Sequence, residues 1–153
     1  KTIGVTGSSQ GGFLSLAVAA LDKRITFLAP VHDAMCDYEA EIHGVAGGWP
    51  HYFYKEDKAM GAAWKEQKLT ELEKMRLEGA RYYDGANFAR RITCPGWYSF
   101  GYNDEVVPPT SSYGLYNSVK APKTLSLYQM TGHFWYQEQW DEWQAWIVQQ
   151  LTK

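Results

Sequence analysis

A serine, an aspartate and a histidine occur in this chain in the order and in the settings that nucleophilic catalysis requires. Ser9 is the central residue of the motif GSSQG at positions 7–11, which follows an apolar stretch and precedes a run of small residues. This G-x-S-x-G pattern predicts a nucleophile elbow, a strained strand-to-helix turn that exposes the serine hydroxyl. Phosphate binding is the alternative for a glycine-rich turn that opens a helix. The chain has neither the lysine of a P-loop nor a G-x-G-x-x-G spacing at this turn.

The other two candidates each follow a predicted strand. Asp104 comes shortly after the buried stretch 95–101, and His133 follows the alternating stretch 124–130. Because the carboxyl ends of parallel strands meet at one edge of a sheet, we expect these side chains to converge on Ser9. Asp33, which follows the predicted strand 24–30, is the alternative acid. A simple turn before the prolines is the structural alternative for Asp104.

Strands and helices that alternate along the chain must position these residues. Short apolar runs typical of buried parallel strands occur at 3–5, 24–30, 95–101 and 124–130, and the sheet is expected to resume through 89–95. Helices are predicted at 12–21, 111–119 and 137–151, the last with three tryptophans at core spacing, Trp140, Trp143 and Trp146. The pattern predicts an α/β fold with a mostly parallel sheet and flanking helices.

One segment interrupts this alternation. Residues 34–79 are rich in glycine and aromatic residues and then in charge, and they are predicted to form a cap or lid insertion over the site. Within it, 65–76 predicts a solvated helix with an apolar stripe of Leu69, Leu72 and Met75.

Composition excludes several functional classes. The formal net charge is −2 and the charges are interspersed, which argues against a nucleic-acid partner. No run approaches the roughly 20 apolar residues of a membrane helix, so no membrane partner is expected. No metal-ligand spacing is present, so neither a metal nor another cofactor is predicted. Cys36 and Cys94 can pair or stay reduced, because spacing alone does not show that they meet.

Several segments resemble the acetyl xylan esterase and cephalosporin C deacetylase family, carbohydrate esterase family 7. They are SSQGG at 8–12, IHGVAGGWPH at 42–51, YYDGANFARRI at 82–92, CP at 94–95 and GYNDEVVPPTS at 101–111. The resemblance implies an α/β-hydrolase fold in which Ser9 is the nucleophile, Asp104 the acid and His133 the base. It also implies that the backbone N–H of Gln10 is one oxyanion donor and that a tyrosine-bearing loop upstream supplies the other. The chain departs from the family in having Phe134, where a glutamate usually follows the histidine.

The expected function is therefore that of a serine carbohydrate esterase that removes O-acetyl groups from xylan or xylo-oligosaccharides through an acyl-enzyme. Bulky aromatic residues near the serine suit a small acyl group and can stack on sugars, and the candidates for substrate contact are Trp49, Tyr52, Trp97 and Trp135. A prolyl-oligopeptidase-like serine peptidase is the alternative enzyme. A catalytically degenerate module for carbohydrate binding or subunit interaction is the non-enzymatic alternative.

The chain opens directly on the strand that leads into the elbow, whereas an α/β-hydrolase sheet normally has several strands before that point. Residues 1–153 are therefore expected to be the C-terminal half of one catalytic domain, with the upstream half of that domain as a partner. The resemblance further suggests a homo-oligomer and a secreted or periplasmic location.

Overall fold

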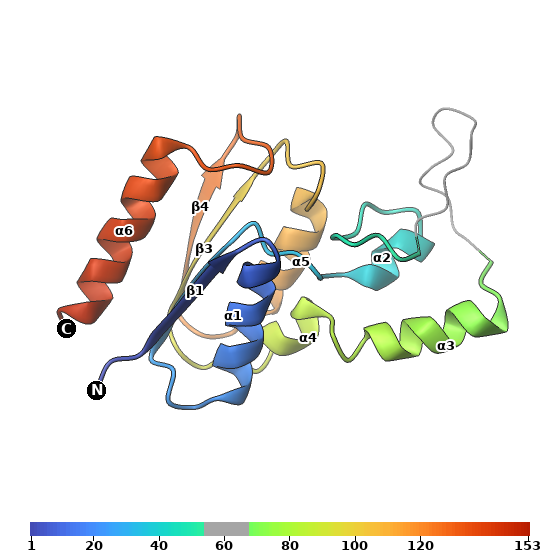
Figure 1. Ribbon diagram of the computed structural model, residues 1–153, viewed down its shortest axis with the longest axis horizontal. Coiled ribbons are helices and arrows are strands. Elements are labelled where there is room, and N and C mark those ends of the chain that lie inside the picture. The colour runs from blue at the N-terminus through green and yellow to red at the C-terminus, as the bar shows by residue number, and fades with distance from the viewer. Residues whose placement is uncertain (54–67) are drawn as a thin grey trace.

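The computed structural model describes residues 1–53 and 68–153, which build a parallel sheet covered by helices on both faces (Figure 1). Within these residues the sheet has four strands, and they lie side by side in chain order. The strands are β1 (Gly4–Ser8), β2 (Phe27–Val31), β3 (Gly96–Gly101) and β4 (Lys123–Tyr128). The predicted α/β architecture with a parallel sheet is confirmed.

Helices of different lengths connect and cover the strands. They are α1 (Gln10–Leu21), α2 (Tyr38–Ile42), α3 (Glu71–Ala80), α4 (Gly85–Ala89), α5 (Pro109–Ser118) and α6 (Gln137–Leu151). Figure 1 shows α6 against one face of the sheet and α1, α4 and α5 against the other, while α2 and α3 extend to one side. Both faces of the central strands are thus buried, which explains why the sequence shows them as continuous apolar runs.

The period-2 alternation of β3 divides its side chains between the two layers. Tyr98 is fully buried in the core formed with α1, α4 and α5, whereas Trp97 is 3% exposed and packs in the core under α6. Ser99 also faces α6, where its hydroxyl accepts a 2.8 Å hydrogen bond from the side chain of Gln139. The indoles of Trp143 and Trp146 pack on this second core, as their helical spacing predicts. The prediction for Trp140 is wrong, because this residue is 39% exposed and its ring stacks on Trp143.

Two predicted elements differ from the structure. The segment 89–95 does not continue the sheet: α4 occupies 85–89, capped by the Asp84 carboxylate, and the strand begins only at Gly96. An aspartate at the N-cap satisfies an otherwise free N–H of the first helical turn, and this local bond favours the short helix over a strand.

The charged helix also differs from its prediction. Residues 65–67 of the predicted helix 65–76 lie outside the described residues. In the described part α3 begins at Glu71, where Thr70 and Glu73 form a capping box at its N-terminus. Leu72 and Met75 are exposed, and the buried face of α3 carries Leu77 and Ala80 instead.

The predicted insertion 34–79 is described only in part. Residues 54–67 lie outside the described residues, so its role as a cap or lid stays a prediction. In the described part, α2 and α3 pack together through Tyr38, Ile42, Leu77 and Ala80 into a small core of their own.

The two cysteines, Cys36 and Cys94, are buried and free. Among the described helices, none has both the length and the apolar character to cross a lipid bilayer.

Candidate active site

Ser9 lies at the sharp turn between β1 and α1. Its backbone has φ 58° and ψ −121°, a region that side chains other than glycine rarely adopt. The surroundings hold this conformation: the Ser9 N–H donates to Val31 O at 2.9 Å, and its carbonyl accepts from the N–H groups of Phe13 and Ala34 at 3.2 Å. A Cβ on Gly7 would lie 2.3 Å from the carbonyl oxygen of Gly11, so the turn needs glycine at position 7. The predicted nucleophile elbow is present in the backbone.

Asp104 and His133 are brought to the same edge by the loops after β3 and β4. These loops are joined at their bases, since the Asn103 N–H donates to Thr131 O at 2.9 Å. A Cβ on Gly101 would lie 2.3 Å from that same oxygen, so glycine allows the two loops to approach. The close packing of the loops therefore holds the aspartate and the histidine in register.

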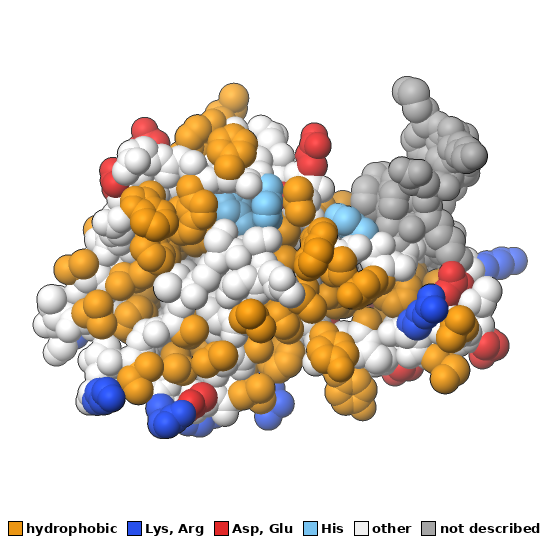
Figure 2. Space-filling view, viewed as in Figure 1, with side chains coloured by type: hydrophobic (Ala, Val, Ile, Leu, Met, Phe, Trp, Pro, Cys, Tyr) orange, Lys and Arg blue, Asp and Glu red, His pale blue; other side chains and the backbone are white. Residues whose placement is uncertain are grey.

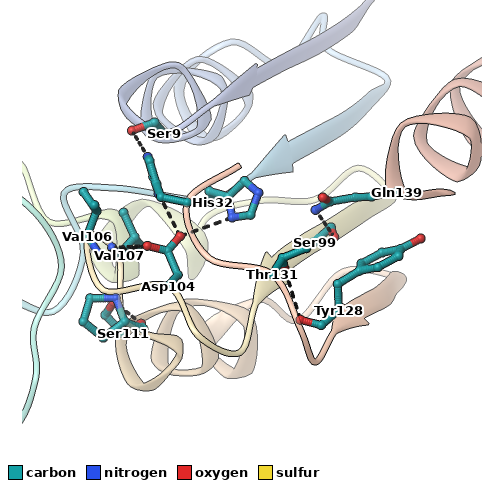
Figure 3. A network of polar contacts seen from close by, with 12 residues as sticks. Ser9, His32, Ser99, Asp104, Val106, Val107, Ser111, Tyr128, Thr131 and Gln139 are labelled. Carbon is teal, nitrogen blue, oxygen red and sulfur yellow. Dashed lines mark hydrogen bonds and ion pairs between the residues drawn. The ribbon is translucent and has the colours of Figure 1, made fainter. Parts of the chain in front are cut away.

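A continuous chain of hydrogen bonds joins the three side chains (Figure 3). His133 Nε2 is 2.9 Å from Ser9 Oγ, and His133 Nδ1 is 2.7 Å from Asp104 Oδ2. The prediction that Asp104 rather than Asp33 contacts this histidine is confirmed. Figure 2 shows histidine side chains reaching the surface among hydrophobic neighbours, and His133 keeps 25% of its side chain accessible.

The electrostatics of Asp104 suit an ionised acid. Its Oδ1 accepts from the N–H groups of Val106 and Val107 at 2.9 and 2.8 Å, and its side chain is fully buried. Burial alone would raise the pKa of Asp104, but contacts with His32, Val107 and His133 outweigh it and hold the pKa below its ordinary value. The turn predicted as the structural alternative for Asp104 is also present. The same carboxylate accepts the backbone N–H groups of this turn and contacts His133.

Asp33 has the opposite environment. It is 1% exposed, its Oδ1 has no hydrogen-bond partner in the described structure, and burial raises its pKa to about 7. Its Oδ1 lies close to Gly12 at the start of α1. The aspartate after β2 is thus a buried group on the α1 side, outside the hydrogen-bonded chain.

Together with Asp33, His32 forms the rival site that the sequence offers after the predicted strand 24–30, but the structure connects its side chain with Asp104 instead. This side chain is 1% exposed and its Nδ1 lies 3.3 Å from Asp104 Oδ2, the oxygen that His133 also contacts. Its place directly after β2 is visible in the sequence, but nothing in the sequence relates it to a loop 72 positions later.

His32, Asp104 and His133 form a group of the described chain whose ligating atoms lie within 4.8 Å of one another. A metal ion bound there would take the place of the proton between His133 and Asp104, which are 2.7 Å apart. The short contact favours hydrogen bonding over metal ligation at this site, and the expectation of no metal stays a prediction.

The four aromatic candidates lie in different settings. Trp135 packs beside the site, with its ring centroid 6.4 Å from that of His32. Trp49 is 39% and Tyr52 67% exposed, and Tyr52 lines a cavity of about 550 Å³ with Phe53, Arg76 and Tyr83. The prediction for Trp97 is wrong: β3 turns this ring into the core under α6, where it has no surface to offer a substrate.

The fold and this edge of the sheet define an α/β hydrolase. The sequence profile of the acetyl xylan esterase (AXE1) family matches residues 1–150, and the chain belongs to that family.

Known relatives agree with this assignment. The chain is 38% identical over 134 residues to the acetyl esterase Axe7A of Xylanibacter ruminicola, which covers 88% of this chain and 28% of that protein. Acetyl xylan esterase from Paenibacillus sp. R4 superposes with a TM-score of 0.75 at 28% identity, over 95% of this chain and 44% of the other. Acetyl xylan esterase 1 from Thermoanaerobacterium sp. matches at 25% identity with the same TM-score, over 96% and 45%.

The chain therefore spans less than half the length of each of these relatives. Peptidases are also found among the similar solved structures, at 11–15% identity, and they share the fold alone.

Proposed function

We propose that this chain supplies the nucleophile, base and acid of a carboxylic ester hydrolase that removes acetyl groups from carbohydrate. The observation that supports the proposal best is the unbroken relay from Ser9 Oγ through His133 to Asp104, at 2.9 and 2.7 Å. Both contacts are within the range for hydrogen bonds between a nucleophile, its base and the group that orients the base.

The reaction would begin with attack of Ser9 Oγ on the acetyl carbonyl while His133 Nε2 takes the hydroxyl proton. The same imidazole then gives this proton to the departing sugar oxygen, leaving an acetyl-serine. Water attacks the acetyl-serine with His133 again as base, which releases acetate and restores the serine. Asp104 accepts from Nδ1–H throughout, so it orients the ring and stabilises its protonated form.

The backbone N–H of Gln10 is the proposed oxyanion donor. Gln10 is the first residue of α1, and an N–H in the first turn of a helix has no intrahelical acceptor. It also lies at the positive end of the helix dipole, which favours the negative charge of the tetrahedral intermediate.

Acetylated xylan or xylo-oligosaccharide is the proposed substrate. The family supports this choice, as do the partly exposed rings of Trp49, Tyr52 and Trp135, which offer aromatic faces to sugar rings. A serine peptidase would use the same relay. Family membership favours the ester, whereas the peptidase structures match only in fold.

Replacement of the nucleophile tests the proposal. In the full natural chain, Ser9→Ala is expected to lower kcat for p-nitrophenyl acetate and for acetylated xylo-oligosaccharides by at least about 10³-fold, since loss of a triad serine costs more than most single changes. Ser8→Ala, which alters the neighbouring hydroxyl outside the relay, is the matched control and should keep activity within about threefold.

Three results would contradict the proposal. One is a Ser9→Ala enzyme that keeps more than about a hundredth of the activity, which would move the nucleophile elsewhere. Another is failure of wild type to react with a fluorophosphonate probe, which would favour the non-enzymatic module. The third is cleavage of peptides but not of acetyl esters, which would favour the peptidase.

A further inference from the structure

His32 is a buried histidine that the proposed reaction does not use. It follows β2 directly, its N–H donates to Ser99 O at 2.9 Å, and its backbone has φ 49°. A histidine at positive φ is uncommon and strained, so the packing around it must hold it in place. Its ring centroid is 5.4 Å from that of His133 and 6.4 Å from that of Trp135, with the His32 and Trp135 rings in an edge-to-face arrangement.

Both carboxylate oxygens of Asp104 are in contact with nitrogen atoms. Two backbone N–H groups hold Oδ1, whereas Oδ2 faces two imidazoles, His133 Nδ1 at 2.7 Å and His32 Nδ1 at 3.3 Å (Figure 3). The His32 contact is longer than that of His133, and at 3.3 Å its Nδ1 does not complete a hydrogen bond in the described structure.

The position of His32 defines its tautomer. An unprotonated Nδ1 would point a lone pair at a carboxylate oxygen 3.3 Å away, and the repulsion would be strong in a buried site. Nδ1 must therefore bear the hydrogen. Neither ring nitrogen completes a hydrogen bond among the described residues, but Nδ1 has a carboxylate oxygen 3.3 Å away, whereas a buried N–H on Nε2 would lack an acceptor. The ring is therefore neutral, with its proton on Nδ1.

We propose that His32 is a positioning residue that donates from Nδ1–H to Asp104 Oδ2 and so fixes the carboxylate plane toward His133. This inference rests on the proposed function for the role of Asp104. A neutral His32 also suits the reaction, because a second positive ring 5.4 Å from His133 would oppose protonation of the base.

Three replacements at position 32 distinguish the effect of losing the N–H donor from the effects of side-chain volume and of backbone strain. His32→Asn keeps an N–H near the place of Nδ1 and tolerates positive φ. His32→Gly relieves the strain but has no donor, and His32→Leu fills space but has no donor.

In the full natural chain, the Gly and Leu variants are expected to lower kcat for p-nitrophenyl acetate by between about tenfold and 10²-fold, because the base loses its fixed orientation. KM should stay within about twofold, since His32 does not contact substrate, and the Asn variant should recover kcat to within about threefold of wild type. A Gly variant with wild-type kcat, or an Asn variant as slow as Gly, would overturn the proposal.

A measurement on the unmodified protein stands even if the variants fail to fold. Side-chain ¹⁵N NMR of the wild type is expected to show His32 as the neutral Nδ1–H tautomer, and the Nε2–H tautomer would overturn the proposal. This result does not depend on activity. Absence of Ser9-dependent turnover would refute the proposed function alone, whereas the wrong tautomer in an active enzyme would refute the role of His32 alone.

Discussion

The loops that follow β2 and β3 each bury an aspartate at the same edge of the sheet, but the two carboxyl groups are in opposite states. Asp104 accepts two backbone N–H groups and faces two imidazoles, and its pKa is lowered. Asp33 has an oxygen without a partner in the described structure, and burial raises its pKa to about 7. The two residues share their type, their burial and their position after a strand, so these properties do not explain the difference in pKa.

The number of donors around each carboxylate explains it. Removing water from a carboxylate disfavours its charge, and only hydrogen bonds or positive groups restore the balance. The loop after β3 turns back so that the N–H groups of Val106 and Val107 point at Asp104, whereas the chain after β2 turns Asp33 toward α1 and Gly12. Loop conformation therefore selects which of two buried acids can assist a base.

The largest expected effect comes from neutralising each acid in turn. Asp104→Asn should lower kcat for p-nitrophenyl acetate by about 10⁴-fold, because an amide in this place favours the wrong tautomer of His133. Asp33→Asn should change kcat by less than about threefold, since this side chain lies outside the relay. Steady-state kinetics on the two variants measure the contrast.

Equal losses in the two variants would contradict the distinction between the two acids. Circular dichroism of both proteins controls for unfolding.

The pH dependence of stability should separate the two acids next. The folded pKa of Asp33, about 7, lies above the ordinary value of 3.8, so between these values the folded state holds more protons than the unfolded state. Stability is therefore lost as pH rises through this window, and the penalty is complete above the folded pKa. Replacement by asparagine removes this dependence.

Urea unfolding at pH 5 and pH 8 measures the effect. The stability of Asp33→Asn relative to wild type should rise by about 2–3 kcal/mol between the two pH values. A difference that does not change with pH would mean that Asp33 is ionised in the folded protein at both.

The smallest effect concerns the space around Asp33. A Cβ on Gly12 would lie 2.7 Å from Asp33 Oδ1 and 3.1 Å from Val31 O, whereas a Cβ on Gly11 meets nothing within 4 Å in the described structure. Gly12→Ala should therefore lower stability by about 1–2 kcal/mol relative to Gly11→Ala, which gains helix propensity at no steric cost. Thermal unfolding of the pair measures this, and equal stabilities would show that Asp33 can move away.

Much of the architecture was predictable from local pattern. The helix expected at 137–151 has those bounds, and the strands after which Asp104 and His133 were placed are β3 and β4. Hydrophobic periodicity and turn residues act over a few positions, so a single sequence records them directly. The order of Ser9, Asp104 and His133 along the chain, each at a strand end, was enough to predict their meeting.

Tertiary structure alone decided which atoms meet and which side chains are buried. His32 and Asp104 are distant in the chain, and the 3.3 Å between them depends on how two loops fold back on one sheet edge. The sequence leaves Trp97 open as a residue for substrate contact, whereas the pleat of β3 buries its ring under α6. The raised pKa of Asp33 likewise depends on tertiary packing, because packing buries this carboxyl group and leaves its Oδ1 without a hydrogen-bond donor in the described structure. Burial and donor geometry are properties of the packed chain, because they depend on residues that local sequence patterns do not connect.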